Sequence, residues 1–161
     1  MRIWPFALVA LGAAASAGPV EKLSDFELED QNAVARTYQF PKPKITVMTI
    51  ADHKGSNQLA PWIARIYERY EKRIDIDGVA DVSMIPGPFH GIFREAFRKQ
   101  LTYPVMLDWG GSVVKQFGHT KGVANIYVID RQGFIVKHLA GPVGDEAARE
   151  LFLTIDRVLG R

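Results

Sequence analysis

The sequence predicts one α/β domain of three layers, in which a central mixed sheet carries an added N-terminal hairpin. Short runs rich in β-branched residues alternate with amphipathic helical segments, and the chain ends in a hairpin followed by a helix. Strands that alternate with helices pair in parallel, whereas a terminal hairpin adds antiparallel strands. With 161 residues, 47% of them hydrophobic and 24% charged, the chain can bury a core.

Each expected element follows from a local pattern. Residues 45–50 form an apolar, β-branched run typical of a strand buried on both faces. Apolar residues then recur at helical spacing, with Pro61 in the first turn, where its missing N–H costs little. The expected order is a hairpin from 26–28 and 37–40, strand 45–50, helix 59–73, strand 79–85, a helix around 92–97, strand 104–107, helix 113–117, strands 123–129 and 134–139, and helix 145–159.

Residues 1–17 have the features of a secretory signal peptide. Arg2 precedes an apolar run over 3–15, and residues 15–17, Ala-Ser-Ala, offer the small side chains that a signal peptidase accepts. The run is short for a membrane span. We therefore expect residues 18–161 to form the mature domain, exported to the periplasm or otherwise out of the cytoplasm, with no stable membrane insertion after cleavage.

Charge and cysteine content exclude several classes of function. Twenty Lys and Arg face eighteen Asp and Glu, and this near balance argues against a nucleic-acid partner. The chain has no cysteine, which excludes a disulfide scaffold, a thiol nucleophile, a dithiol redox centre and an all-cysteine zinc site. The expected partner is an unidentified protein or a small anionic ligand.

Three segments match the pattern of a known family. Residues 122–133, Gly-Val-Ala-Asn-Ile-Tyr-Val-Ile-Asp-Arg-Gln-Gly, are similar to a Gly-Val-Pro-x-x-aromatic-aliphatic-Ile-Asp-x-x-Gly segment; residues 26–31 and 104–108 are similar to two others. Together they resemble the thioredoxin-like superfamily, in the branch of alkyl hydroperoxide reductase/thiol-specific antioxidant proteins and exported thiol-disulfide oxidoreductases. The resemblance covers roughly residues 23–159 and implies a thioredoxin-like three-layer sandwich.

The chain departs from this family at both positions of its thiol chemistry. The family's Cys-x-x-Cys lies where the first buried strand meets its helix, and residues 53–56 occupy that slot here. The family's cis-proline is replaced by Ala124, and a non-proline cis bond costs ~2.5–4 kcal/mol, so we expect a trans bond. The resemblance therefore implies a cysteine-less member, which we expect to be a non-catalytic binding or accessory module. Its candidate ligand-binding slot consists of His53, Lys54, Gly55, Ser56 and Ala124.

Two features favour binding at this slot. A strand end that leads into a helix presents unpaired N–H groups, and Lys54 adds a positive charge, so a carboxylate or phosphate could dock there. The alternative is a solvated loop with Ser56 as the helix N-cap. In the segment 86–93, Phe89 and His90 could form a binding lip over the slot; alternatively, Phe89 completes the core.

Histidines suggest a second function. His53, His90 and His119 lie in or beside loops that the predicted topology opens at one end of the sheet. Three neutral imidazoles could bind Zn²⁺ or Cu²⁺, which makes a histidine-based metal-binding protein the alternative prediction. The sequence has no His-x-His or His-x-x-x-His pair, so scattered surface histidines without a cofactor are the simpler interpretation.

Overall fold

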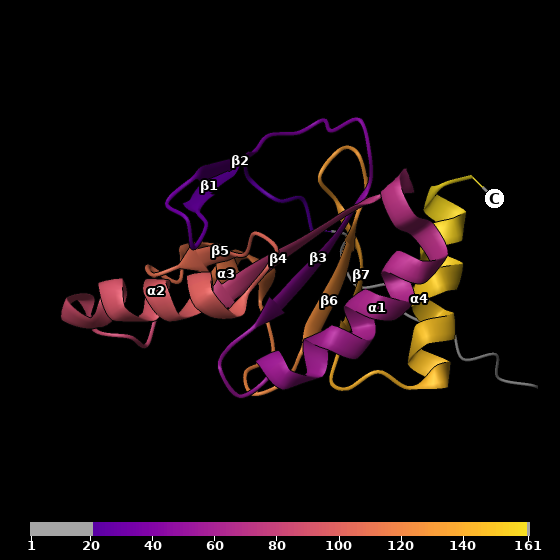
Figure 1. The fold of residues 1–161 in the computed structure, drawn as a ribbon. Helices are drawn as coiled ribbons and strands as arrows, with labels where there is room; N and C mark the ends of the chain where they lie inside the picture. The colour runs from indigo at the N-terminus through magenta and orange to yellow at the C-terminus, as the bar shows by residue number, and fades with distance from the viewer. Residues whose placement is uncertain (1–20, 161) are drawn as a thin grey trace, which may run out of the picture.

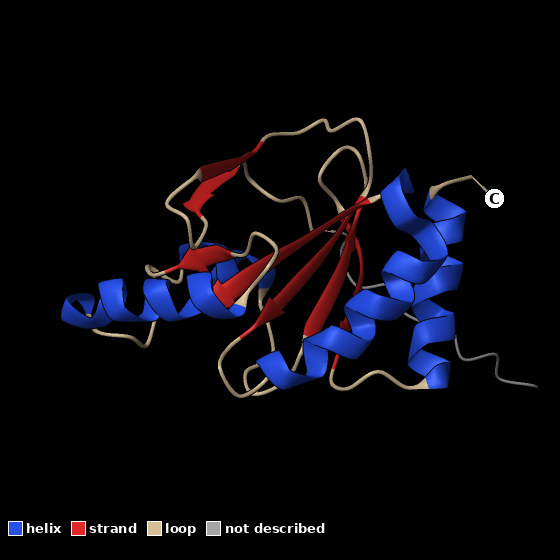
Figure 2. Cartoon of the chain, viewed as in Figure 1, coloured by secondary structure: helices blue, strands red, loops and turns tan. Residues whose placement is uncertain are grey.

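The computed structural model describes residues 21–160 and confirms the predicted α/β architecture. Five strands form one mixed sheet in the order β5-β4-β3-β6-β7, and β1 and β2 form the separate N-terminal hairpin (Figures 1 and 2). The strands are β1 Phe26–Glu29, β2 Ala35–Tyr38, β3 Thr46–Ala51, β4 Asp75–Asp81, β5 Met106–Asp108, β6 Asn125–Ile129 and β7 Ile135–Ala140; the helices are α1 Leu59–Tyr70, α2 His90–Gln100, α3 Ser112–Phe117 and α4 Asp145–Val158. The expected signal peptide, residues 1–17, lies outside the described residues.

Strand β3 occupies the centre of the sheet and is buried along its whole length. It pairs in parallel with β4, Thr46 opposite Asp75, and antiparallel with β6, Thr46 opposite Ile129. The carboxyl ends of β3 and β4 and the start of β6 therefore lie at the same end of the sheet, as the sequence predicts. That end carries the candidate slot.

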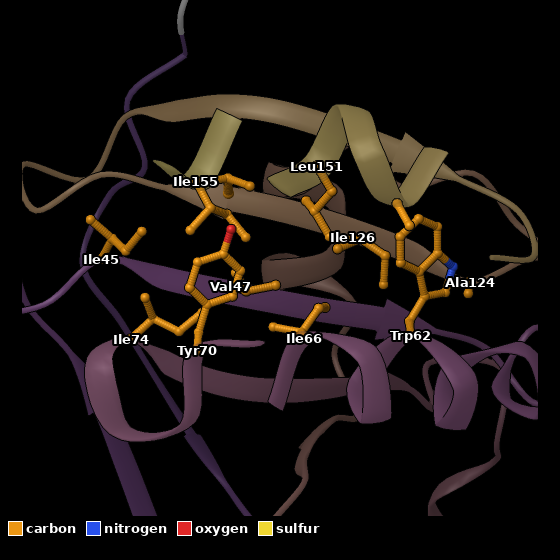
Figure 3. Packing of buried hydrophobic residues seen from close by; sticks show 12 residues of the cluster. Ile45, Val47, Trp62, Ile66, Tyr70, Ile74, Ala124, Ile126, Leu151 and Ile155 are labelled. Carbon is orange, nitrogen blue, oxygen red and sulfur yellow. The ribbon is translucent and has the colours of Figure 1, made fainter. Parts of the chain in front are cut away.

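Each face of the sheet supports its own core. On one face, helices α1 and α4 pack over Val47 and Ile126, and Figure 3 shows Trp62 and Leu151 approaching these strands from the two helices. On the other face, α3 and the β1–β2 hairpin cover a second cluster: Leu23, Tyr38, Met48, Ile50, Val79, Met106, Val113, Val114, Phe117, Tyr127 and Ile129. Side chains of β3 alternate between the two clusters, which explains why its run of six residues is apolar or β-branched throughout.

Two buried aromatic residues of α1 join it to the C-terminal part of the chain. The Trp62 indole N–H donates to the carbonyl oxygen of Gly141 at 3.0 Å. The Tyr70 hydroxyl lies 3.1 Å from the carbonyl oxygen of Phe152 and 3.0 Å from Asp156 Oδ1, both on α4. Burial raises the pKa of Tyr70 to about 12, so the hydroxyl keeps its proton and remains a donor.

The sequence misplaces one strand. The predicted strand 79–85 is observed as β4 over Asp75–Asp81, because pairing with β3 overrides the low strand propensity of Asp75 and Asp77. The chain turns after Asp81, whose Oδ1 accepts hydrogen bonds from the backbone N–H of Ser83 at 3.1 Å and from its hydroxyl at 2.6 Å. The side chain that ends the strand therefore also directs the turn.

The N-terminal hairpin closes the β5 edge of the main sheet. Asp30 forms an isolated bridge to Met106. Beside it the Gln31 amide behaves as a peptide group would: its Nε2–H donates to Tyr103 O at 2.8 Å, and its Oε1 accepts from Val105 N at 2.8 Å. A buried glutamine thus pairs with the segment that leads into β5.

The segment before the hairpin lies along the opposite edge. Lys22 bridges Phe134 beside β7, and the backbone N–H of Ile135 donates to Glu21 O at 2.9 Å. Residues 21–31 therefore contact both edges of the five-stranded sheet.

Helix α2 lies outside both cores. None of its residues is buried, and none belongs to either buried cluster. Figure 1 shows it toward the β5 edge of the sheet, on the side away from α4. Within residues 21–160, no helix is long and apolar enough to cross a membrane.

Candidate functional site

The turn between β3 and α1 is held by the carboxylate of Asp52. Its Oδ1 accepts a hydrogen bond from Gly55 N at 2.8 Å, and its Oδ2 accepts one from Gly122 N at 2.8 Å. Burial by itself would raise the pKa of Asp52, but the two backbone donors, aided by nearby His119, outweigh it and lower the pKa. One ionised side chain therefore joins the slot to the loop before β6.

Gly55 packs directly against that loop. A Cβ at this position would lie within 3.0 Å of the backbone of Val123, including its carbonyl oxygen. The φ angle of Gly55 is −80°, which any residue can adopt, so space rather than conformation requires glycine here. Nearby, Gln58 Oε1 accepts a hydrogen bond from Ala124 N at 3.0 Å. The slot and the loop before β6 form one packed unit.

Ala124 belongs to the core. Its side chain is fully buried, and Figure 3 shows it beside the indole of Trp62. The bond before Ala124 is trans, as expected; within the described chain the cis peptide bond precedes Pro41. Asn125 holds the loop in this position, because its Nδ2 donates to the carbonyl oxygens of Thr120 at 2.8 Å and Val123 at 3.0 Å. Of the five predicted slot residues, Gly55 and Ala124 are buried.

The other three slot residues face solvent. The Ser56 hydroxyl donates to His53 O at 2.8 Å, and no side chain caps the start of α1. The role of Ser56 is therefore to close the turn, not to cap the helix. Lys54 extends past Gly122, and it is the exposed cation that the slot offers to a ligand.

The three histidines of the predicted metal site contact different residues. His53 is exposed, and the ring of His90 stacks on that of Trp109 with centroids 4.0 Å apart. His119 Nε2 lies 3.0 Å from Asp81 Oδ2, and both side chains are buried. Residues 21–160 contain no group of three or more His, Asp or Glu arranged to hold a metal ion. Binding of Zn²⁺ or Cu²⁺ stays a prediction that this geometry does not favour.

The sequence does not predict a group of polar contacts that lies near the slot. His119 pairs with Asp81, and Asn125 Oδ1 lies 2.8 Å from His138 Nε2. The ring of His138 stacks on that of Tyr127 with centroids 4.2 Å apart. Partial desolvation of the ring, followed by the charge of His119, lowers the pKa of His138, although the residue as a whole is exposed. The predicted topology brings the end of β4 to the loop before β6, but the predicted bounds 79–85 place Asp81 inside the strand and so hide its contact with His119.

The lip residues lie at the start of α2. Phe89 ends a short 3₁₀ turn, Gly87–Phe89, and 50% of its surface is exposed. This exposure excludes the alternative in which Phe89 completes the core. His90 Nε2 lies 2.9 Å from the carbonyl oxygen of Ile85. The lip is therefore a fixed segment that presents an aromatic side chain to solvent.

Replacing Gly55 by alanine tests the contact between the slot and the next loop. We expect Gly55→Ala to lower the free energy of unfolding by about 1–3 kcal/mol, since the new Cβ overlaps backbone atoms that cannot move independently. Gly87→Ala is the matched control, because a Cβ there meets no atom within 4 Å. Urea unfolding of both variants measures the difference; equal stability of the two variants contradicts the contact.

Replacing Asp52 by asparagine tests the hydrogen bonds made by the carboxylate. The lowered pKa of Asp52 means that its ionised form stabilises the fold above the unfolded-state pKa of about 3.9, and that this contribution is lost as the pH falls through the lower, folded-state pKa. We expect Asp52→Asn to cost about 1–3 kcal/mol at pH 7 and less at pH 3, as measured by urea unfolding. Glu68→Gln, on the exposed face of α1, is the control. A loss of the same size at both pH values contradicts the assignment.

Known proteins match this chain by structure and not by sequence. No family model and no curated protein matches it. The exposed lipoprotein thioredoxin Etrx1 from Streptococcus pneumoniae matches with a TM-score of 0.65 at 19% identity, over 83% of this chain and 99% of that chain. A thiol:disulfide interchange protein of the thioredoxin family from Chlorobium tepidum matches with a TM-score of 0.60 at 14% identity, over 89% and 99% of the two chains.

A peroxidase-type relative has the same architecture. Peroxidoxin BcpB from Mycobacterium tuberculosis matches with a TM-score of 0.55 at 18% identity, over 88% of this chain and 96% of that chain. Likeness at these identities shows a shared fold. The protein thus has the thioredoxin-like fold, in a form that contains no cysteine.

Proposed function

We propose that this protein is an exported, non-catalytic binding or accessory module built on the thioredoxin-like fold. One observation carries the proposal: the slot that holds two thiols in redox-active proteins of this fold is here closed by its own backbone. Gly55 packs against Val123, and Asp52 accepts hydrogen bonds from both loops. A site closed in this way holds its loops in place and offers no nucleophile to a substrate.

The remaining polar groups of the slot support the same proposal. The Ser56 hydroxyl donates to a carbonyl within its own turn, so no neighbouring base activates it as a nucleophile. The buried His119 side chain contacts the buried carboxylate of Asp81 and, within residues 21–160, no hydroxyl that it could activate. These side chains stabilise the loops, and none is arranged in a nucleophile–base pair.

Binding would use the groups that stay exposed at this end of the sheet. Lys54 offers a cation, and the lip offers the aromatic ring of Phe89 with His90 beside it. A cation and an exposed aromatic residue at the same end of the sheet suit a partner that presents both an anionic and an apolar group. The partner is a protein, or a small anionic ligand, of this chemistry.

Export is supported by the N-terminal sequence. Residues 1–17 have the charge, apolar run and small-residue end of a signal peptide. One structural relative is itself described as an exposed lipoprotein. A core that needs no disulfide also folds in an oxidising compartment without oxidative assistance.

The proposal predicts that the protein does not accelerate reduction of insulin disulfides by dithiothreitol. We expect turbidity to rise at the rate of dithiothreitol alone, because no thiolate is present. The double variant His53→Cys, Ser56→Cys should show only weak activity, since the closed loop and the trans bond before Ala124 remain. Turnover by the unaltered chain would contradict the non-catalytic assignment.

A photoreactive amino acid at position 54 tests the binding role in the native cell. We expect the full chain to form discrete covalent adducts from position 54, because this side chain faces solvent beside the slot. The same probe at position 68, on the exposed face of α1, is the control and should give no discrete adduct. Absence of adducts at position 54, or the same adducts at both positions, counts against binding at the slot.

A further inference from the structure

Helix α2 and the residues around it carry most of the large apolar side chains that the fold leaves uncovered. The exposed fractions are 82% for Met84, 50% for Phe89, 68% for Ile92, 43% for Phe93 and 47% for Tyr103. None of these residues belongs to either buried cluster. Clustered exposure of this kind is uncommon on a monomeric soluble protein and marks an interaction surface.

The apolar residues of α2 share one face of the helix. Phe89, Ile92, Phe93, Ala96 and Phe97 follow the spacing i, i+3, i+4, i+7 and i+8, which places them on one side of an α-helix. We call this set the α2 face. Tyr103 follows the helix within three residues of its end, so an aromatic residue with a polar hydroxyl lies beyond its last turn.

Cations border the α2 face on both sides. At 100° per residue, Lys99 lies next to Ile92 on one border; on the other, His90 lies next to Phe97 and is followed by Arg94 and Arg98. The side chains of Arg98 and Lys99 are 59% and 74% exposed. Both contact Glu95, and Arg94 contacts Glu29 of β1 at 2.8 Å. Within α2 itself, three cations stand against one carboxylate, so the helix is positively charged.

We propose that the α2 face docks the protein onto an anionic phospholipid surface. An apolar helix face flanked by Arg and Lys is the arrangement that lies in a membrane interface, with its side chains among the upper acyl chains and its cations at the phosphates. The position of α2 suits this contact, because the helix extends beside the edge of the sheet, away from α4 (Figure 1). The α2 face shares Phe89 with the lip, but its other residues lie outside the slot and the lip, and the docking proposal does not depend on the proposed function.

Charge favours lipid over a second copy of the chain. A symmetric dimer through the α2 face would bring the same surface of two copies together. Arg94, Arg98 and Lys99 of one copy would then approach those of the other, which opposes association. An anionic lipid surface instead supplies the opposite charge along both borders of the face.

The absence of cysteine allows a site-specific test in the full chain. Ile92→Cys introduces a single thiol on the α2 face, and Leu153→Cys introduces one at a 60% exposed apolar position on α4. Each variant is labelled with a nitrobenzoxadiazole fluorophore and mixed with vesicles of equimolar phosphatidylglycerol and phosphatidylcholine. We expect the emission of the label at position 92 to shift to shorter wavelength, and that of the label at position 153 to stay unchanged. Because each label reports its own position, the apolar segment at residues 3–15 does not confound the result.

Two further measurements identify the role of charge. Vesicles of phosphatidylcholine alone should leave the label at position 92 unchanged. In the Ile92→Cys chain, Arg98→Gln with Lys99→Gln should weaken binding about fivefold for each cation removed. No shift at position 92, an equal shift at position 153, or an equal shift with neutral vesicles would overturn the proposal. A shift that grows with protein concentration in the absence of vesicles would also overturn it, since it would show that a second copy covers the face.

Discussion

Strand β3 is buried on both faces, and this burial determines where the other elements must pack. Its side chains enter the two cores alternately, so each face of the sheet must be covered: one by α1 and α4, the other by α3 and the hairpin. Parallel pairing with β4 and antiparallel pairing with β6 then bring the carboxyl end of β3 beside the loop before β6. The geometry of the slot therefore follows from the burial of one strand.

At the carboxyl end of β3, polar side chains hold two loops together by hydrogen bonds. Asp52 uses both carboxylate oxygens on backbone N–H groups of two loops, and Asn125 uses its amide on the second loop. Buried polar groups cost free energy unless they are paired, so a network of this kind fixes one arrangement of the loops. The thioredoxin-like fold thus retains its characteristic turn while the turn takes on a structural role.

The fold could be predicted from the sequence because its signals are local and strong. The β-branched run at 45–50 and the helical stripe after Pro61 each identify one element without knowledge of its neighbours. The start of β4 could not be predicted in this way, since Asp75 forms a strand only through pairing with β3. The candidate slot could be located, but not the burial of Ala124 or the pairing of His119 with Asp81, because both depend on packing between segments distant in sequence.

The contacts made by residues 21–31 have a consequence for solubility. The outermost strand of an open sheet exposes unpaired backbone groups, which can recruit the same strand of another molecule and begin aggregation. Here the backbone of Glu21 and Lys22 pairs with residues at the start of β7. At the other edge, Asp30 bridges Met106 of β5, and Gln31 hydrogen-bonds to the segment before it. A chain shortened past this segment would lose Leu23 from the second core and expose both edges of the sheet, so the segment also protects the folded protein from association with copies of itself.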